Sequence, residues 1–347
     1  MKIDEVDARI LKTLLRDVRT SFSEIAKDCG MSSNAIRIRF ERLKKNGVIT
    51  GSITQVNPKK FGYDCVAFLL IKAEANNENE VYEFIQKMPN LGCFKPLGRY
   101  NIQTMVALKN LDELANRIEQ IKSHPKVLAV KEIILVDAAS IDHPENLVIK
   151  PLDELSHISE DLSENKKPAI IQSHPVKVEK NGLEESDELD DIDMAIIKIV
   201  SENASISFRK IAKKVGISTQ LVIKRYKRLD KTVLPLSAAT VDLRKLGYKG
   251  LALLLVRTSK THTISKVFDE IVQIPNIIVA HKCVGAVDMY LVVPFFNVRE
   301  LLAVRQRLRG TPGIKEIELS IDEPFSSWPL NLFAQHYFKT KAKQTKN

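Results

Sequence analysis

Two segments of the chain, 186 residues apart, carry nearly the same pattern. Residues 3–11 read IDEVDARIL, and residues 189–197 read LDDIDMAII. They stay in register without a gap as far as Lys45 and Lys231, and the similarity resumes at 61–63 (FGY) and 246–248 (LGY). A period this long indicates a duplicated unit of about 150 residues containing several elements, rather than a solenoid of short repeats.

Composition fits several ordinary globular domains. The chain has 347 residues, 44% hydrophobic and 28% charged, which predicts about two to four domains with their own cores. No run of 18 apolar residues occurs, so no membrane partner is predicted, and the charged start argues against a signal peptide. The four cysteines are scattered without a Cys-x-x-Cys pair, which favours free thiols, a cytoplasmic location and no metal or other cofactor.

Positive charge is concentrated at the start of each unit. Residues 1–60 contain 13 Lys/Arg and 7 Asp/Glu, and residues 189–248 contain 12 and 6, so each segment has a surplus of 6. Residues 147–188 have 5 Lys/Arg and 10 Asp/Glu, a deficit of 5. A localised basic surplus is typical of proteins that bind a polyanion, although solvated helix surfaces also carry such charge.

Each unit opens with a pattern of three helices. In the first unit, residues 6–14 have apolar side chains at helical spacing after an acidic start. Ser21 and Glu24 predict a capping box that begins a second helix, and Gly30 is expected to end that helix in a left-handed conformation. Ser32 then predicts the N-cap of a third helix.

The third helix is basic on its outer side. One arc carries the apolar side chains that face the core, Ile36, Phe40 and Leu43 in the first unit and Val222, Tyr226 and Leu229 in the second. The opposite arc holds Asn34, Arg37, Ile38, Glu41 and Lys45, and in the second unit Gln220, Ile223, Lys224, Lys227 and Lys231. Two short helices, a glycine turn and a basic third helix are typical of a helix-turn-helix unit.

The second part of each unit alternates strands with helices. In the first unit, strands are predicted at 65–73, on both sides of Gly98 and at 127–136, with helices at about 79–88 and 111–122. The second unit repeats the order at 251–258, 263–274, 278–284, 289–294, 298–309 and 314–321. The order β-α-β-β-α-β is the ferredoxin-like arrangement. Because its helices cover one face of the sheet, we expect the other face to pair with the second copy.

The predicted fold class is α+β, with six segments along the chain. They are a winged helix-turn-helix domain (1–60), a ferredoxin-like regulatory and dimerisation domain (63–146), a flexible acidic linker (147–186), a second winged helix-turn-helix domain (187–246), a second ferredoxin-like domain (248–325) and a C-terminal segment with a basic tail (326–347). The linker and the tail from Lys339 are expected to be disordered.

This combination resembles the Lrp/AsnC, or feast/famine, family of prokaryotic transcription regulators. Residues 7–11 (DARIL) are similar to the family's opening helix, and 32–43 with 46–49 (NGVI) to its recognition helix and following turn. Residues 98–101 (GRYN) resemble the Gly-x-Tyr-Asp turn of its regulatory domain. Family members usually hold one unit and dimerise, so the resemblance implies a single-chain pseudo-dimer on double-stranded DNA, with further homo-oligomerisation.

The second copy departs from the family pattern at two places. Residues 232–235 (TVLP) replace NGVI, and the turn at 285–288 reads GAVD, without the aromatic residue. The basic helix before the first of these departures is intact.

The third helices supply the predicted DNA contacts. Asn34 and Arg37 are expected to read bases, because Asn suits adenine and Arg suits guanine in bidentate geometry; Gln220 and Lys224 occupy comparable positions. Flanking cations are expected to bind phosphates. The full predicted set is Ser32, Ser33, Asn34, Arg37, Arg39, Arg42, Lys45, Ser218, Thr219, Gln220, Lys224, Arg225, Lys227 and Arg228. The apolar Ile38 and Ile223, expected to be exposed, are suited to thymine methyl groups.

The family resemblance implies an effector site near the glycine turns. A small molecule such as an amino acid would bind close to Gly98, Tyr100, Asn101, Gly285 and Asp288. A glycine in a tight β-turn, however, needs no ligand to explain it.

Two alternatives to the two-headed regulator remain open. Sirohaem decarboxylases share this plan and place histidines and aromatic residues around the same turn, whereas this chain has only His281, beside Cys283, near its second turn. That reading makes the protein an enzyme, while the regulator reading assigns no catalytic residue. Alternatively, Pro235 suggests a regulator in which only the first helix-turn-helix binds DNA.

Overall fold

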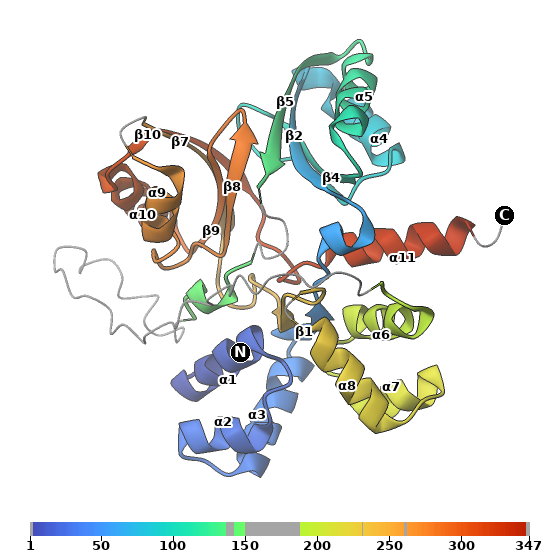
Figure 1. The fold of residues 1–347 in the computed structure, drawn as a ribbon. Coiled ribbons are helices and arrows are strands. Elements are labelled where there is room, and N and C mark those ends of the chain that lie inside the picture. The colour runs from blue at the N-terminus through green and yellow to red at the C-terminus, as the bar shows by residue number, and fades with distance from the viewer. Residues whose placement is uncertain (1–2, 137–141, 150–187, 231, 260–261, 345–347) are drawn as a thin grey trace.

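The computed structural model describes residues 3–136, 142–149, 188–230, 232–259 and 262–344. Most of the predicted linker, residues 150–186, therefore lies outside the described residues. The fold is α+β: two helix-turn-helix domains lie below two sheet domains that stand side by side (Figure 1).

The first helix-turn-helix domain has the three helices that the sequence predicts. They are α1 (Glu5–Arg16), α2 (Phe22–Cys29) and α3 (Ser33–Lys45). The Ser21–Glu24 capping box is present, and Gly30 ends α2 with φ +63°, in the left-handed region that glycine adopts without strain. Ser32 caps α3 by accepting the backbone N–H of Ala35.

The second domain repeats this arrangement with α6 (Asp191–Glu202), α7 (Phe208–Val215) and α8 (Thr219–Leu229). Each third helix is followed by one strand, β1 (Ile49–Thr54) or β6 (Ser237–Val241). The two strands pair with each other in an antiparallel ribbon in which Ser52 faces Ala239. The ribbon joins the two helix-turn-helix domains within one chain.

The sheet domains have the predicted β-α-β-β-α-β order. The first contains β2 (Cys65–Ala73), α4 (Glu78–Lys87), β3 (Gly92–Phe94), β4 (Ile102–Leu108), α5 (Leu111–Lys122) and β5 (Val127–Leu135). The second contains β7 (Gly250–Thr258), α9 (Ile264–Ile271), β8 (Val279–Gly285), β9 (Met289–Phe295), α10 (Val298–Gly310) and β10 (Ile314–Asp322). Short 3-10 turns lie at η1 (Pro58–Phe61) and η2 (Ala75–Asn77).

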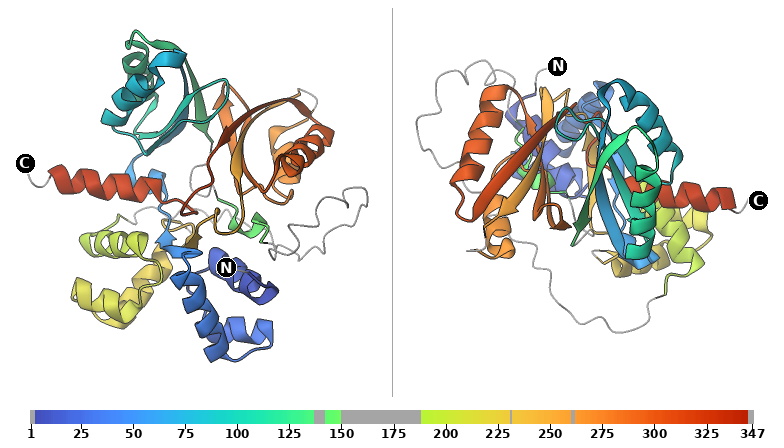
Figure 2. Two further views of the ribbon diagram at one scale, coloured as in Figure 1. Left: turned by 180° about the vertical axis from the view of Figure 1, so that it is seen from behind. Right: turned by 90° about the horizontal axis from the view of Figure 1, so that it is seen from above.

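The two sheets join along their edges as well as facing each other. β5 pairs with β8, so that all strands of the two sheet domains form one sheet of order β10-β7-β9-β8-β5-β2-β4-β3. Seen from above, the helices lie on the outer sides and the strands lie between them (Figure 2). Alternate residues of β2 face the helices of the first sheet domain or the second half of the molecule. Because both faces of the strand are buried, its sequence is a continuous apolar run.

The segment after each sheet packs onto the other half. Residues 142–149 contain η3 (Pro144–Asn146), which contacts α1 of its own half. From the same segment, the carbonyl of Val148 accepts a hydrogen bond from the hydroxyl of Tyr248 in the second half. The matching segment forms α11 (Leu332–Gln344), where Phe333 and Tyr337 pack on Tyr63 of the first half.

Two expectations for these segments were wrong. Leu147 and Ile149, assigned to the flexible linker, are buried, because they belong to the hydrophobic core that both halves share. Disorder was expected from Lys339, yet α11 continues to Gln344; its aromatic side chains anchor it, which a charge count does not detect.

Candidate nucleic-acid interface

A buried carboxylate fixes the third helix of the first domain. The Asp7 side chain is fully buried and accepts hydrogen bonds from Arg39 (3.0 Å) and Arg42 (2.5 Å). Arg39 also binds Asp4 at 2.6 Å, and this hydrogen bond raises the pKa of the Arg39 guanidinium. The ion pairs tie α3 to the start of α1, and the apolar Ile36 packs into the core beneath.

The second domain repeats the network. Arg225 binds Asp190 at 2.6 Å and Asp193 at 2.9 Å, and Arg228 binds the other oxygen of Asp193. The backbone N–H of Asp193, followed by the Arg225 guanidinium, holds the pKa of the Asp190 carboxyl below its usual value. Asp193 is fully buried, like its counterpart in the first domain. Each basic helix is thus held on the first helix of its domain by equivalent charge-assisted hydrogen bonds.

Each of these four arginines, predicted from sequence to bind DNA phosphates, has an aspartate partner within the protein. Arg39 and Arg225 are only about a quarter exposed, at 24% and 21%, whereas Arg42 and Arg228 are 44% and 39% exposed. Contact of any of the four with DNA stays a prediction. The more exposed pair are the better candidates, since their outer N–H groups face solvent while one edge binds aspartate.

The remaining predicted contacts lie on the outer faces of α3 and α8. Ser33, Asn34, Arg37, Lys45, Gln220, Lys224 and Lys227 are all exposed, as are the caps Ser32 and Ser218, while Thr219 is half-buried. Arg37 donates to the Asn34 side-chain oxygen at 2.8 Å, so the two predicted base readers lie side by side. Ile38 is 60% exposed, as expected, but Ile223 is half-buried, contrary to expectation; its position corresponds to Arg37 of α3, not to Ile38, so it lies about 100° away around the helix.

Arg19 links the two domains, and sequence reasoning missed it. Its guanidinium lies 4.4 Å from the ring centroid of Phe208 and 4.6 Å from that of Tyr226, both in the second domain. It also donates to the carbonyl of Ile206 at 3.2 Å. A cation over two aromatic rings fixes one domain against the other. No motif marked this residue, since its partners are 187 or more positions away.

The residues of the predicted effector turns have structural roles. The Asn101 side chain accepts the backbone N–H of Ala73 at 2.8 Å, and the Asp288 side chain accepts that of Thr258 at 2.7 Å. A Cβ added to Gly98 would lie 2.2 Å from Ser320 Oγ, and one added to Gly285 would lie 2.7 Å from the Glu132 carbonyl.

Each turn therefore docks on the last strand of the other half. Tyr100 is buried beside the first turn. Close docking explains both glycines without a ligand, so effector binding stays a prediction.

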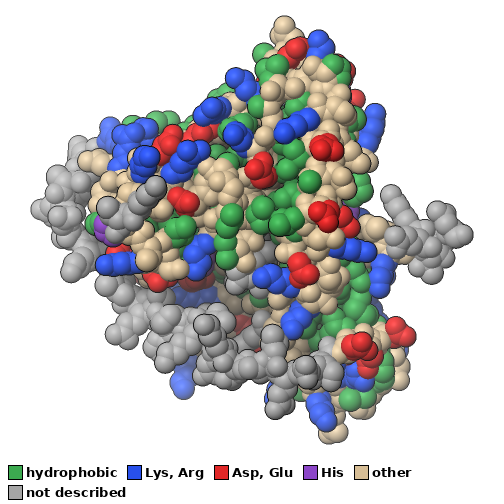
Figure 3. Space-filling view, turned by 45° about the horizontal axis from the view of Figure 1, so that its top comes forward, with side chains coloured by type: hydrophobic (Ala, Val, Ile, Leu, Met, Phe, Trp, Pro, Cys, Tyr) green, Lys and Arg blue, Asp and Glu red, His purple; other side chains and the backbone are tan. Residues whose placement is uncertain are grey.

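Metal-binding clusters and membrane-spanning helices are absent from the described parts of the chain. These parts contain no group of three or more His, Cys, Asp or Glu side chains placed to hold a metal ion, and no helix long and apolar enough to cross a membrane. The four cysteines are free thiols. On the upper face of the sheet domains, lysines and arginines are interspersed with acidic side chains (Figure 3).

Comparison with known proteins finds a family match for each of the two helix-turn-helix domains. The AsnC-type helix-turn-helix domain matches residues 3–44 and again residues 189–230. The HTH-type transcriptional regulator FL11 of Pyrococcus horikoshii is 30% identical over 135 residues, covering 39% of this chain and 89% of the relative. The protein of the same name in Pyrococcus furiosus is 32% identical over 122 residues, covering 35% and 81%.

One solved structure extends over the whole chain. The siroheme decarboxylase NirDL matches with a TM-score of 0.56 and 14% identity, covering 99% of this chain and 100% of that one. At this identity the likeness shows the fold alone. The repeated domain match and the 30% identity to a nearly complete regulator assign the family: the chain belongs to the Lrp/AsnC family, whose members carry the AsnC-type helix-turn-helix and act as transcription regulators.

Proposed function

We propose that this protein is a sequence-specific DNA-binding regulator in which one chain supplies both DNA-binding heads of a family dimer. The first head is the helix-turn-helix domain with α3, and the second head is the one with α8. The observation that carries the proposal is the intrachain β1–β6 ribbon, which joins the two domains directly after their basic helices. α3 and α8 lie on either side of this ribbon, on the same side of the sheet domains (Figure 1). Two linked heads suit two half-sites on one face of a duplex.

The exposed side chains of α3 and α8 supply the reading chemistry. Arg37 and Asn34 have the donors and acceptors that bidentate recognition of guanine and adenine requires, and Lys224 and Gln220 offer similar groups. Lys45 and Lys227, with the outer N–H groups of Arg42 and Arg228, provide charge for phosphates.

The experiment that tests this proposal is selection of bound fragments from genomic DNA, followed by gel-shift titration of the enriched sequence. We expect two half-sites whose spacing is near one helical turn, about 10 bp, or a multiple of it. Recovery of fragments with no shared sequence would contradict the proposal.

A regulator that reads with its first head alone is the closest competing form. The sequence 232–235 (TVLP) replaces the NGVI turn, yet Leu234 is buried and β6 still reaches the ribbon. Arg225→Ala combined with Arg228→Ala separates the two forms. If both heads bind, DNA affinity falls at least tenfold; if only the first head binds, affinity is unchanged. Because both arginines also hold Asp193, circular dichroism must show that the variant keeps its helices.

A tetrapyrrole decarboxylase is the second candidate function, and the full-length likeness to NirDL is the observation that favours it. A related structure of that enzyme holds an iron-uroporphyrin III analogue. Mixing the purified protein with iron-uroporphyrin III and recording the visible spectrum tests the candidate. We expect no shift of the absorbance bands, since His281 lies buried on β8 and the retained basic helices favour DNA. A saturable shift would instead support the enzyme.

A further inference from the structure

A cavity of about 100 Å³ lies between the facing sheets, beside the segment that follows the ribbon strand β1. Its walls come from both halves: β2 and β4 of the first half, β7, β8 and β9 of the second, and the segment that leads into α11. None of the residues proposed for DNA contact or for the effector turns lines it. The cavity is therefore a separate feature of the molecule.

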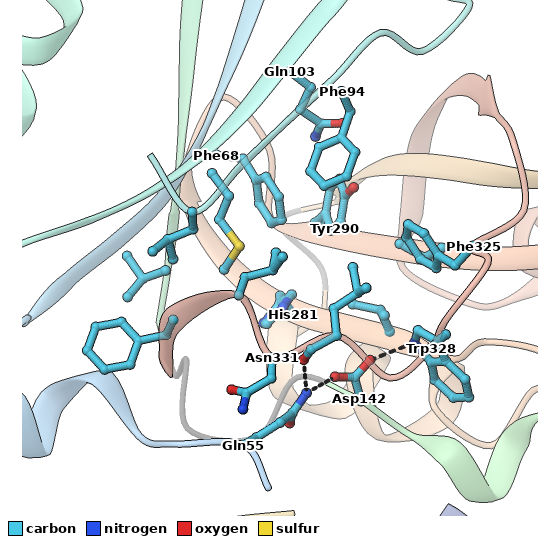
Figure 4. Close-up of a pocket in the computed structure, with 18 of the residues that line it drawn as sticks. Gln55, Phe68, Phe94, Gln103, Asp142, His281, Tyr290, Phe325, Trp328 and Asn331 are labelled. Atoms are coloured by element: carbon cyan, nitrogen blue, oxygen red, sulfur yellow. Dashed lines mark hydrogen bonds between the residues drawn. The ribbon is translucent and has the colours of Figure 1, made fainter. Parts of the chain in front are cut away.

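Aromatic rings form much of the cavity wall. Phe68 of β2 stacks on Tyr290 of β9 with 4.5 Å between ring centroids, and the rings of Phe94, Phe325 and Trp328 surround the rest of the space (Figure 4). Ring faces carry negative charge density, so they attract cations as well as apolar groups.

A carboxyl group lies at one end of the cavity. The two oxygens of Asp142 accept hydrogen bonds from the Gln55 side chain and from the indole N–H of Trp328, the latter at 2.9 Å (Figure 4). Burial raises the pKa of Asp142 to about 6, so the group is mostly ionised at pH 7.5. Both of its hydrogen-bond donors are neutral, and the nearby His143 and Glu145 act on its pKa in opposite directions. A buried carboxylate of this kind is costly unless it is compensated, and a cation would compensate it.

The charge of the lining selects against anions. A second carboxyl, Asp322, also borders the cavity, and burial raises its pKa. The described residues that line the cavity include these two aspartates and His281, but no lysine or arginine. A carboxylate or phosphate ligand would thus meet like charge without a fixed cation to pair with, whereas an ammonium group would meet carboxylate and ring faces.

The volume limits the ligand to a small molecule. An apolar cavity of about 150 Å³ holds benzene, which has six non-hydrogen atoms, so this cavity of about 100 Å³ accommodates about four. A tetrapyrrole is several times larger.

We propose that this cavity binds a small organic amine, a short branched aliphatic chain with its ammonium group at Asp142. The body would lie between Phe68, Tyr290 and Trp328.

Occupancy of the cavity would bear on the DNA-binding heads, a consequence that rests on the proposed function, whereas binding itself does not. Gln55 follows β1 directly, and the side-chain amide of Asn331 donates to the carbonyls of Thr54 in β1 and Ser201 in α6, both at 2.9 Å. Both Gln55 and Asn331 line the cavity. A ligand would therefore contact the residues that hold the ribbon and the second head.

The experiment uses the full chain and its single tryptophan. Trp328 is the only tryptophan in the sequence, so intrinsic fluorescence reports on the cavity alone. The probes are isopropylamine, 2-propanol and acetate, which have about the same number of non-hydrogen atoms and differ in the charge of the polar group. At pH 7.5 we expect isopropylamine to change the fluorescence saturably and to bind at least tenfold more tightly than 2-propanol, and acetate to bind least.

Three variants locate the site. Asp142→Asn should remove the preference for the amine and change the affinity for 2-propanol less than twofold. Leu253→Phe, on the β7 wall, should fill the space and abolish binding of both, which keeps the test available if Asp142→Asn does not fold. Asp288→Asn, at the glycine turn of the second half, should leave isopropylamine binding unchanged.

Four results would overturn the proposal: no saturable fluorescence change, equal affinity for amine and alcohol, tighter binding of acetate, or loss of binding only in Asp288→Asn. Gel shifts with and without isopropylamine then test the consequence for DNA separately. A protein that binds isopropylamine at Trp328 but never shifts DNA would retain the cavity proposal and lose the proposed function.

Discussion

The two helix-turn-helix heads share one scaffold and differ on the face that meets solvent. Asp7 with Arg39 and Arg42 has its counterpart in Asp193 with Arg225 and Arg228, each 186 residues on. Both networks hold the third helix on the first through a fully buried carboxylate. The scaffold has thus kept its charged contacts in both copies of the duplication.

The outer faces have diverged at the positions suited to reading bases. At the same register, Arg37-Ile38 of α3 is replaced by Ile223-Lys224 of α8, so the cation moves by one residue. One residue is a rotation of about 100° around a helix. Ile38 is exposed while Ile223 is half-buried, consistent with this rotation. The difference indicates that two equivalent helix-turn-helix frameworks present different side chains to solvent at the positions proposed to read DNA.

Removing the buried carboxylate should have the largest effect, and it tests whether the frames are equivalent. Asp7→Ala and Asp193→Ala each leave two arginines without their shared acceptor, and we expect each to lower the free energy of unfolding by about 2–4 kcal/mol. Chemical unfolding followed by circular dichroism measures the loss, and hydrogen exchange of α3 and α8 localises it. Glu41→Ala, on the exposed side of α3, is the control and should change stability little. If the losses of unfolding free energy differ by more than about 2 kcal/mol, the two buried carboxylates do not stabilise their domains equally.

Truncating the reading side chains should have the next largest effect. Arg37→Ala and Lys224→Ala should each weaken binding to the selected DNA by about 1–3 kcal/mol, or roughly 5- to 150-fold, and relax specificity at one base of one half-site. Gel shifts on operators with single base changes measure this.

Giving the first head the residues of the second tests whether these positions determine the preferred base. Arg37→Ile combined with Ile38→Lys gives the first head the sequence of the second at these positions. The preferred base of the first half-site should then change toward that of the second. An unchanged preference would show that other residues read the DNA.

The junction between the halves should respond to pH with a smaller effect. The folded pKa of Asp142, about 6, lies above its ordinary value of 3.8, so its contribution to stability is complete below about pH 4 and is lost as pH rises through 6. The free energy of unfolding of the natural protein, relative to Asp142→Asn, should therefore fall by about 1 kcal/mol between pH 5 and pH 8. Parallel urea titrations of the two proteins give the difference. A rise over this range would show that the carboxyl is more acidic when folded.

The smallest effect is expected from the peripheral lysines. Lys45→Ala and Lys227→Ala should each lower the slope of log affinity against log salt by about one unit and weaken binding to all sequences similarly. Titrations at several salt concentrations measure the slope. If Lys227→Ala leaves the slope unchanged while Lys45→Ala lowers it, the second head does not contact the phosphates at this position.

Local elements were predictable from sequence because their signals are local. The Ser21 capping box, the left-handed Gly30 and the inward apolar arc of α3 depend on residues within one or two turns of each other. The β-α-β-β-α-β order followed from apolar runs and turn residues in the same way. The repeat then allowed each unit to support the interpretation of the other.

Contacts between distant segments were not predictable. The pairing of β1 with β6 and of β5 with β8 joins strands well over 100 residues apart. The sequence of each strand does not indicate which strand it pairs with. The same holds for Arg19 against Phe208 and for Asp142 with Trp328. The aspartate partners of Arg39 and Arg42 lie on another helix, so a helical projection of α3 alone showed only outward cations.

The ribbon of β1 and β6 has a consequence for how such a molecule responds to its own abundance. A regulator assembled from two separate chains dissociates on dilution, so its DNA occupancy at low copy number falls with the square of its concentration. Here both strands belong to one chain, and tethered partners meet at an effective concentration on the order of millimolar. The paired state then persists even at a few molecules per cell, and occupancy depends on concentration to the first power. Halving the amount of this protein would halve its occupancy of a weak site, where a dissociating dimer would keep a quarter.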